Sequence, residues 1–316
     1  MGHVLAVDIG GTNSRFAAFI TSADGQLIMK EKIWLSSKAA RSFAHLLEML
    51  ADSEFPYSPQ DFDITVIAVA GPVIRGVSCN ITNVDWDIDF TDGYKSYGFK
   101  HVVLINDFAA QAYACRTPAV EGCRVVHQAE ISPTGTLGVI GAGTGLGHCA
   151  LVPVPSGGFV SVPSEAGHIN FPFETIDELD FCSFVKDRRG ISYCYGDEIL
   201  TGRGINILHL YLTGEDLEPR DVAQKMAQGC KTLEWYAMFM ARCCRNYALS
   251  VCATGGLYIS GGIIAKNPFV VEQPVFMKEF LNSTSMGGFL KKVPIFLNDN
   301  QDSGLFGAAL CGALKL

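Results

Sequence analysis

Two glycine turns, each flanked by apolar residues, constrain the fold of this 316-residue chain more than any other feature. The first joins the apolar residues 3–9 and 14–20 through Gly10-Gly11-Thr12-Asn13, and the second joins residues 137–140 and 148–152 through Gly141 to Gly147. Each pattern predicts a β-hairpin, because glycine and asparagine enter positive φ at little cost. Two such hairpins in one chain predict two related halves.

The same turns are candidate phosphate-binding loops. Glycines leave backbone N–H groups uncovered, so a run of them can surround phosphate oxygens, and Asp8 at the end of the first strand can hold the accompanying cation. An ordinary hairpin turn explains the first turn as well. The second turn does not match the dinucleotide spacing G-x-G-x-x-G, and the chain contains no Gly-Lys-Ser or Gly-Lys-Thr of a Walker A loop.

A second informative stretch places two polar residues between an apolar strand, residues 102–105, and an alanine-rich helix from residue 108. Asn106 and Asp107 therefore end the strand, and in α/β sheets the carboxyl ends of strands face the ligand. The alternative is that Asp107 only caps the helix.

A third stretch, residues 161–171, combines Glu165 and His168 among small loop residues. A carboxylate and an imidazole three residues apart form a hydrogen-bonding set suited to several hydroxyl groups. A metal site is the weaker interpretation, because no further ligands occur at fitting spacing.

Composition limits the classes of partner. A net charge of −8 without a basic run argues against nucleic acid as a partner. The longest apolar stretch, residues 235–258, is interrupted by Arg242, Arg245 and Asn246, and no signal-like segment opens the chain, so we expect a cytoplasmic protein without membrane contact. The eleven cysteines include no Cys-x-x-Cys pair, which predicts inert, reduced thiols and no zinc cage.

Five motifs, in order along nearly the whole chain, resemble the bacterial ATP-dependent glucokinase family. They are Asp8-Ile9-Gly10-Gly11-Thr12-Asn13, Asn106-Asp107-Phe108, Gly141 to Gly147, Ser164-Glu165-Ala166-Gly167-His168 and Ser260-Gly261-Gly262-Ile263. The resemblance implies an α/β fold of the actin-like ATPase, or ribonuclease H-like, type: two domains, each with a mixed five-stranded sheet, and a cleft between them. The small domain would contain residues 1–108 and 302–316, and the large domain residues 109–301.

The resemblance also implies a function: a glycolytic homodimer that phosphorylates the 6-hydroxyl of glucose with ATP and Mg²⁺. Asp107 would act as the general base. The other sugar ligands would be Asn83, Asn106, Glu165, His168 and Asp197. The nucleotide would contact Asp8, Gly10, Gly11, Thr12, Asn13, Gly143, Thr144, Gly261 and Gly262, with Asp8 facing Mg²⁺ through water.

The chain departs from the family pattern at two places. Ser164 and Ala166 replace glycines in Gly-Glu-Gly-Gly-His, which predicts a slightly reshaped sugar loop. Asp197 stands where the family has a sugar-binding glutamate in Glu-x-Val-Leu-Ser-Gly-x-Gly, so its reach is one methylene shorter, and neighbouring Glu198 is the alternative contact.

Other functions remain open at this stage. A kinase for a related hexose, or a catalytically impaired sugar sensor, would keep the same residues. A nucleotide-driven chaperone or filament protein would keep the hairpins without needing Asn106, Asp107, Glu165 and His168. A zinc-containing transcriptional regulator does not fit the cysteine spacing, and no DNA-binding helix pair precedes the first strand.

Overall fold

The computed structural model describes residues 2–22 and 24–316, which form two compact units. The first unit contains Met1–Gly122, Val154–Ser161 and Asn300–Leu316, and the second contains Cys123–Pro153 and Val162–Asp299. The sequence prediction ended the small domain at residue 108. The first unit extends further because α2 (Asp107–Ala114) packs against α11 (Ser303–Ala313), and α11 in turn contacts β1 (His3–Ile9).

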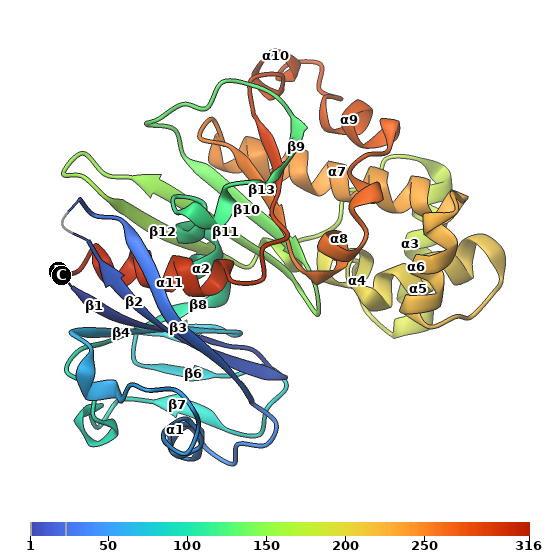
Figure 1. Ribbon diagram of the computed structural model, residues 1–316. Helices are drawn as coiled ribbons and strands as arrows, with labels where there is room; N and C mark the ends of the chain where they lie inside the picture. The colour runs from blue at the N-terminus through green and yellow to red at the C-terminus, as the bar shows by residue number, and fades with distance from the viewer. Residues whose placement is uncertain (1, 23) are drawn as a thin grey trace. The chain divides into compact units, whose positions relative to one another are not determined.

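A five-stranded mixed sheet forms the centre of the first unit, in the order β3-β2-β1-β4-β8 (Figure 1). Its first three strands are antiparallel, as the glycine hairpin predicts, whereas β1, β4 and β8 are parallel. A small three-stranded sheet, β5-β6-β7, belongs to the same unit. The remaining elements are β2 (Asn13–Thr21), β3 (Leu27–Ser36), α1 (Phe43–Ala51), β4 (Ile64–Val69), β5 (Val73–Ile74), β6 (Ser78–Asn80), β7 (Asp87–Asp89) and β8 (Val102–Asn106).

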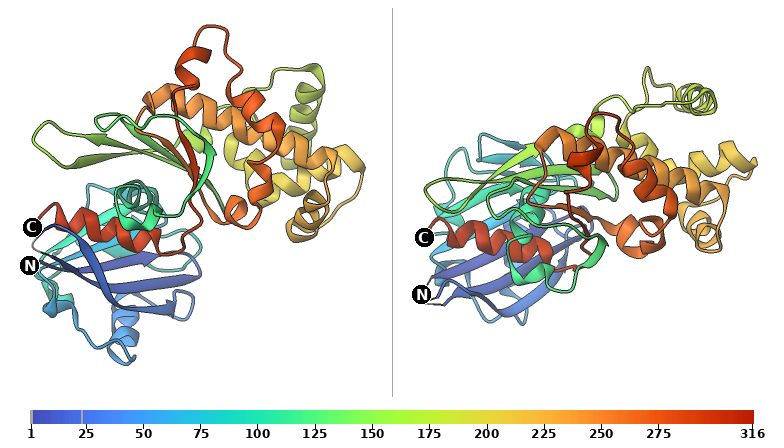
Figure 2. Two further views of the ribbon diagram at one scale, coloured as in Figure 1. Left: turned by 45° about the horizontal axis from the view of Figure 1, so that its top comes forward. Right: turned by 90° about the horizontal axis from the view of Figure 1, so that it is seen from above.

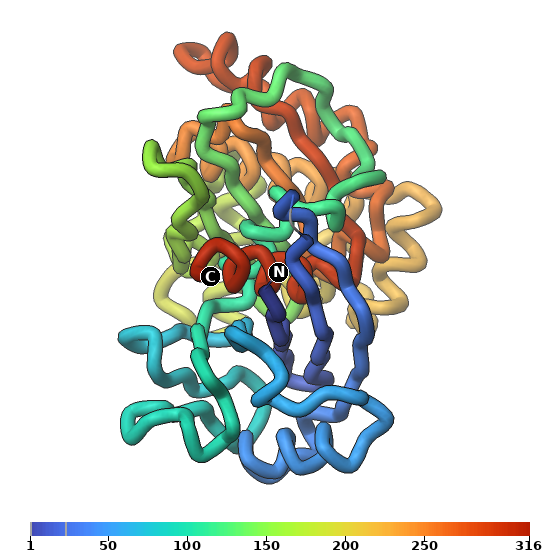
Figure 3. The backbone as a smooth tube through the Cα atoms, turned by 60° about the vertical axis from the view of Figure 1, so that its left-hand side comes forward, coloured from blue at the N-terminus to red at the C-terminus, as the bar shows by residue number. Residues whose placement is uncertain are grey.

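Helix α11 covers one face of this sheet and brings the end of the chain back to its beginning (Figures 2 and 3). The small residues of 302–310 predict a helix that packs closely on a neighbouring sheet, and α11 confirms this prediction, because its glycines and alanines let its backbone approach its neighbours closely. At Gly307 a Cβ would lie 1.7 Å from the carbonyl oxygen of Ala110 in α2. The opposite face packs against α1 and the small sheet through buried aromatic and aliphatic side chains.

The helical spacing of Ala40, Phe43, Leu46, Leu47 and Leu50 predicts a helix over residues 37–50, and α1 is shorter than this prediction. It begins at Phe43, because Ser42 adopts an extended backbone and its Oγ accepts a hydrogen bond from the N–H of His45 at 3.1 Å. A serine at this position satisfies one of the free N–H groups of the first turn. The apolar periodicity located the buried face, and the cap determined where the helix begins.

The second unit contains a six-stranded mixed sheet, in the order β12-β11-β10-β13-β14-β9. The expectation of five strands is wrong here, because β9 pairs antiparallel with the edge of β14. The strands are β9 (Arg124–His127), β10 (Leu137–Ala142), β11 (Leu146–Pro153), β12 (Phe159–Ser164), β13 (Leu257–Ser260) and β14 (Ile295–Leu297). The helices are α3 (Ile176–Arg189), α4 (Gly196–Leu200), α5 (Gly202–Thr213), α6 (Pro219–Ala227), α7 (Lys231–Val251), α8 (Gly262–Lys266), α9 (Pro274–Phe280) and α10 (Gly287–Leu290).

Helix α7 is the central helix of the second unit. The apolar residues of 220–254 are too many for a single stripe and predict either one long packed helix or a helix pair. The structure has a pair, α6 and α7, separated at Gly229, which has a positive φ of 83°. Tyr236, Phe239 and Met240 of α7 are fully buried in the core. Among residues 2–22 and 24–316, no helix is both long enough and apolar enough to cross a membrane.

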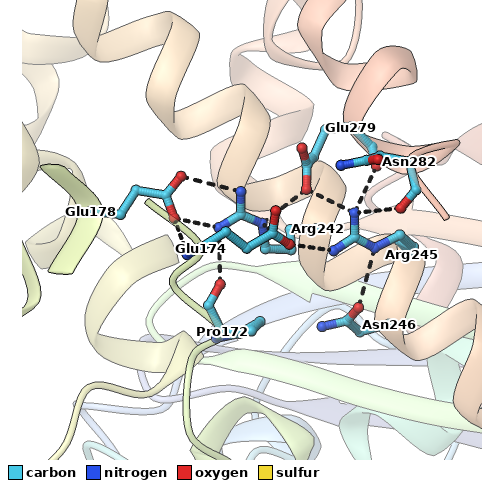
Figure 4. A network of polar contacts seen from close by, with 8 residues as sticks. All are labelled: Pro172, Glu174, Glu178, Arg242, Arg245, Asn246, Glu279 and Asn282. Atoms are coloured by element: carbon cyan, nitrogen blue, oxygen red, sulfur yellow. Dashed lines mark hydrogen bonds and ion pairs between the residues drawn. The ribbon is translucent and has the colours of Figure 1, made fainter. Parts of the chain in front are cut away.

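The arginines that interrupt the apolar stretch of α7 are buried and paired (Figure 4). Arg242 Nη1 donates to Glu178 Oε2 at 2.6 Å, and Arg242 Nε donates to Glu279 Oε1 at 2.9 Å. Arg245 contacts the same Glu279 oxygen at 2.8 Å and Glu174 Oε1 at 2.9 Å. This network joins α7 to α3, to α9 and to the segment that precedes α3.

Candidate active site

Two carboxylates lie at the carboxyl ends of parallel strands in the first unit. Asp8 is the penultimate residue of β1, and Asp107 follows β8 as the first residue of α2. Strand β4 lies between β1 and β8, and its Ala68 is paired with Asp8 on one side and Ile105 on the other. Because neighbouring strands are about 4.8 Å apart, the backbone at Asp8 is about 10 Å from the end of β8. The two carboxylates therefore flank the end of β4.

The environment of Asp107 favours its protonated form. Its pKa is raised to about 7, mainly by burial and further by the negative charge of Asp8. The N–H of Phe108, which donates to Asp107 Oδ1 at 2.9 Å, acts in the opposite direction. Burial also raises the pKa of Asp8, while the positive charge of Arg15 lowers it. A carboxylate with a pKa near neutrality is well suited to accept a proton during a reaction.

Asn106 is the N-cap residue of α2. Its Oδ1 accepts from the N–H of Phe108 at 2.9 Å, and its Nδ2 donates to the carbonyl of Gly71 at 3.1 Å. The alternative that Asp107 serves only as the cap is therefore wrong, because Asn106 occupies that position. A side-chain amide has two N–H donors and two lone pairs, so Asn106 can make further bonds to a ligand.

The first glycine turn joins β1 to β2, and the N–H of Gly10 donates to the carbonyl of Asn13 at 3.0 Å. The hairpin is confirmed, but the reason given for its glycines is wrong, since neither has a positive φ. Gly11 is needed for space: a Cβ there would lie 2.7 Å from the carbonyl oxygen of Thr82 and 2.8 Å from Asn83 Cβ. Asn83 itself has a φ of 64°, which asparagine tolerates. Asn83 therefore lies directly against the candidate phosphate loop at Gly11.

The second glycine turn joins β10 to β11 in the second unit. The N–H of Gly143 donates to the carbonyl of Gly145 at 2.9 Å, and Thr144 is exposed at the tip. This arrangement confirms the second hairpin. No Cβ clash would arise at Gly143, so its glycine leaves open space on one side of the turn.

The third glycine turn lies against the second. Gly261 follows β13 with a φ of 93°, and a Cβ at this position would be 2.5 Å from the carbonyl oxygen of Ala142 at the end of β10. Gly262 begins α8 and has open space around its Cα. The structure therefore brings Gly143, Thr144, Gly261 and Gly262 to one end of the parallel pair of β10 and β13.

Glu165 and His168 lie in the loop after β12, on a single 3₁₀ turn (Ala166–His168). Glu165 Oε2 is 3.9 Å from His168 Nε2, and both side chains are more than half exposed. The hydroxyl of Tyr193 donates to the carbonyl of His168 at 3.1 Å, and the ring of Tyr195 lies 5.4 Å from the imidazole. The two polar side chains are therefore accessible, while the hydrogen bond from Tyr193 holds the backbone of their loop.

Asp197 is buried in the first turn of α4 and connects two loops. Its Oδ1 accepts a hydrogen bond at 2.5 Å from the N–H of Leu146, directly after the second glycine turn. The same oxygen would lie 3.2 Å from a Cβ at Gly167, in the loop of Glu165 and His168. Its second oxygen, Oδ2, is 3.5 Å from Arg203 Nη2.

Glu198, the alternative sugar contact, is more fully engaged with side chains of the second unit. Its Oε1 lies 3.2 Å from Arg203 Nη2 and accepts from the hydroxyl of Tyr195 at 3.3 Å. Its Oε2 is buried, makes no hydrogen bond, and lies 3.8 Å from Arg189 Nε. Sequence reasoning missed Arg203 and Tyr195, although the position of Arg203 between two glycines, six residues after Asp197, was a signal that could have identified it.

Sequence reasoning also missed Arg15, which lies on β2 beside Asp8. Arg15 Nη1 is 3.4 Å from Asp8 Oδ2, and its guanidinium stacks on the ring of Trp34 at 4.4 Å. Arg15 Nη1 further donates to the carbonyl of Gln301 at 2.5 Å. The pairing of Asp8 with Arg15 across the hairpin was accessible from the register that the turn predicts.

The residues around Asp8 fit a magnesium ion that is held mainly by a bound nucleotide. Among the residues that the structure describes, no group of three or more His, Cys, Asp or Glu side chains could hold a metal on its own. Gly304 of α11 leaves space beside Asp8, since a Cβ there would be 2.5 Å from Asp8 Oδ2. Mg²⁺ commonly uses one or two carboxylates together with phosphate and water oxygens.

Each unit thus has a glycine hairpin and polar side chains at strand ends on an α/β scaffold, and the chain shares the actin-like ATPase fold of solved glucokinase and ROK hexokinase structures. The sequence model of the Glucokinase family matches residues 5–315, and the chain belongs to this family. The resemblance inferred from the five motifs is confirmed, and with it the assignment to the glucokinases.

Known relatives are similar over more than nine-tenths of their length. The glucokinase of Sinorhizobium medicae is 29% identical over 317 residues, covering 97% of this chain and 91% of the relative. The crystal structure of glucokinase from an Antarctic psychrotroph has a TM-score of 0.83 at 24% identity, with 98% of both chains covered. A ROK family glucokinase from Streptomyces griseus, in complex with glucose and AMPPNP, has a TM-score of 0.64 at 17% identity, covering 99% of this chain and all of that one.

Proposed function

We propose that this chain transfers the γ-phosphoryl group of ATP to the 6-hydroxyl of glucose, with Asp107 as the general base. The observation that carries the proposal is the place and pKa of Asp107: it follows a parallel strand, and its pKa of about 7 suits proton transfer near neutral pH. The AMPPNP and glucose in the Streptomyces griseus structure support ATP and glucose as the substrates.

Phosphoryl transfer requires positioning and charge stabilisation more than covalent chemistry by the protein. We assign proton acceptance to Asp107, because the hydroxyl becomes more acidic as its oxygen bonds to phosphorus. Asn106 is the last residue of β8 and the N-cap of α2, and Asp107 is the first residue of that helix. The cap therefore fixes the backbone from which the carboxylate projects. Burial and the charge of Asp8 keep the carboxylate basic enough to take the proton.

We assign the remaining sugar hydroxyls to five polar side chains that the motifs single out. Glu165 and His168 are accessible and paired, so they can accept and donate to neighbouring hydroxyls. Asn106 has further hydrogen-bonding capacity, and Asn83 lies beside the first glycine turn. Asp197 Oδ1 accepts from Leu146, and Oδ2, which also lies 3.5 Å from Arg203 Nη2, has a second lone pair for a direct or water-mediated sugar contact.

We assign the nucleotide to the glycine turns. Gly10, Gly11, Thr12, Asn13, Gly143 and Thr144 would contact the phosphates through backbone N–H groups. Gly261 and Gly262 would lie near the adenosine. Asp8 would hold Mg²⁺ through water, and this ion would supply positive charge to the phosphate oxygens.

The enzyme should need Mg²⁺ for turnover and contain no structural metal. We expect chelation with EDTA to stop ADP release and to leave the melting temperature of the protein without nucleotide unchanged, because Asp8 alone makes a weak site. Added Mg²⁺ should restore activity. Elemental analysis of the purified protein tests the expectation that it contains no structural metal, and stoichiometric zinc would contradict this expectation.

Substitutions at Asp197 should separate its two contacts. Asp197→Asn retains an oxygen that can accept from Leu146, so we expect a higher Michaelis constant for glucose and little change for ATP. Asp197→Ala leaves that N–H without its partner next to the glycine turn, so we expect both constants to rise. Catalytic efficiencies for glucose, mannose and 2-deoxyglucose measure the discrimination between sugars.

Two further variants complete this test. Asp197→Glu restores the family residue and should sharpen the preference for glucose if Oδ2 reaches the sugar through water. Glu198→Gln should leave the sugar constants unchanged. If Glu198→Gln alone raises the glucose constant, Glu198 is the sugar contact, and unchanged constants in every variant would remove both carboxylates from the sugar site.

A glucose-dependent ADP release assay tests the proposed function itself. A kinase for another hexose would show higher efficiency with that sugar, and a sensor would bind glucose without turnover. Glycolytic use, a cytoplasmic location and a homodimeric state remain predictions, which metabolite labelling, fractionation of cells and sedimentation of the purified protein can test.

A further inference from the structure

Two thiols of the second unit that have no part in the proposed chemistry lie in contact. Cys182 lies in the middle of α3, and Cys194 lies two residues before α4. Their Sγ atoms are 3.3 Å apart, although the residues are twelve positions apart in the chain. The cysteine spacing predicted inert thiols, because it contains no Cys-x-x-Cys pair. The packing of α3 against the segment that precedes α4 brings Cys182 and Cys194 into contact.

The two sulfurs differ in accessibility. Cys182 is partly exposed, whereas Cys194 is 1% exposed. Burial, with the Cys182 contact as the next cause, raises the pKa of Cys194 to about 12, and Lys186 on α3 opposes this increase. The thiolate is the reactive form of cysteine. Cys182 is therefore the sulfur that a dissolved oxidant meets first, and Cys194 is the buried sulfur within reach of it.

We propose that Cys182 and Cys194 form a disulfide when the protein meets a small organic disulfide such as glutathione disulfide. The Cys182 thiolate attacks one sulfur of the oxidant, which breaks the oxidant's bond and releases one glutathione thiolate. Cys194 then loses its proton and attacks Cys182 Sγ, which releases the second glutathione. Two electrons and two protons pass from the protein to the oxidant.

The geometry requires only a small movement. A disulfide bond is about 2.05 Å long, so the two sulfurs must approach by about 1.3 Å. The backbone of Cys194 is held on one side, because its carbonyl accepts from the N–H of Phe171 at 2.8 Å. Oxidation therefore draws the segment of Cys194 toward α3 against an existing contact.

This segment carries residues that hold the proposed sugar loop. Tyr193 donates to the carbonyl of His168, and Tyr195 lies beside the same imidazole and donates to Glu198. A displacement near 1 Å at a binding site can cost up to about 100-fold in rate. We therefore expect oxidation to raise the Michaelis constant for glucose by about tenfold, a consequence that rests on the proposed function.

The test uses the full-length protein after incubation with glutathione disulfide or with dithiothreitol. Free thiols are blocked with N-ethylmaleimide, and tryptic peptides are identified by mass spectrometry. We expect the oxidised protein to yield a joined peptide pair containing Cys182 and Cys194, about 2 Da lighter than the two reduced peptides together, since two hydrogens leave. The pair should disappear in Cys182→Ser and in Cys194→Ser. It should persist in Cys252→Ser, which removes an exposed thiol elsewhere.

A stable glutathione adduct on Cys182 without the joined pair, or both cysteines blocked by N-ethylmaleimide, would overturn the proposal. Glucose kinetics then test the link to the sugar loop. The constant should rise on oxidation of the wild type, return with dithiothreitol, and stay unchanged in Cys182→Ser. An unaltered constant in fully bridged protein would refute that link. Absence of glucose turnover in the reduced protein would instead refute the proposed function and leave the peptide result standing.

Discussion

Asp107→Asn should lower turnover by about 100-fold to 10,000-fold while glucose still binds, since general-base catalysis contributes about this much. Asparagine keeps the shape of the side chain and an oxygen that can accept from the N–H of Phe108. It removes only the group that takes the proton. Steady-state kinetics give the turnover, and calorimetric titration with glucose gives the binding. Retention of more than half of the wild-type turnover would exclude Asp107 as the base.

The exposed Asp92 of the same unit provides a matched control, because Asp92→Asn makes the same chemical change away from the proposed site. The pH dependence adds an independent measurement. Because the base must be ionised, catalytic efficiency should rise with pH up to about 7, the pKa of Asp107, and level off above it. The small residual activity of Asp107→Asn should lack this rise.

The same variant should be more stable than the wild type above neutral pH. Folding raises the pKa of Asp107 from its ordinary value of 3.8 to about 7, so the native state holds a proton that the unfolded state releases. Stability from this group is complete below pH 3.8 and is lost as pH rises through 7. Asparagine avoids that loss. The melting temperature of Asp107→Asn should therefore exceed that of the wild type at pH 8, and the difference should vanish below pH 3.8.

Arg242→Met should lower the free energy of unfolding of the second unit by about 3 to 5 kcal/mol, the usual cost of breaking a buried ion pair by removing one partner. Methionine retains much of the apolar stem, but it leaves Glu178 without the guanidinium that contacts both its oxygens (Figure 4). Glu279 keeps its bond to Arg245. Urea titration followed by circular dichroism measures the loss.

Two further variants locate the cause of that loss. The double variant Arg242→Met with Glu178→Gln removes the uncompensated charge and keeps an acceptor for the N–H of Glu174, so we expect it to recover more than half of the stability. Arg124→Met removes an exposed partner of Glu272 and should cost less than about 1 kcal/mol. Equal losses in Arg242→Met and the double variant would show that packing, and not charge, is responsible.

Local patterns in the chain were sufficient to locate most of the strands and the polar residues at their ends. The alternation and length of apolar runs report which backbone segments must be buried, and glycine or asparagine marks where they turn. For this reason the two hairpins, the strand that ends at Asn106 and Asp107, and the close-packed C-terminal helix were all predicted. The order of five motifs was also specific enough to identify the family.

Contacts between distant segments could not be predicted from these patterns, because such contacts depend on how helices and strands pack. The sixth strand, β9, pairs with a strand about 170 residues later, and the bond from Leu146 to Asp197 spans 51 positions. Burial of Arg242 is tolerated only because carboxylates from α3 and α9 meet it.

The same limit explains why the reasons for some residues were mistaken even where the residues were found. Gly11 is required by the approach of Thr82 and Asn83, and not by its own φ. The contact of Cys182 with Cys194 arises where α3 meets the segment before α4. Sequence periodicity reports the burial of each element separately, whereas the distances between side chains are set by the packing of the whole unit.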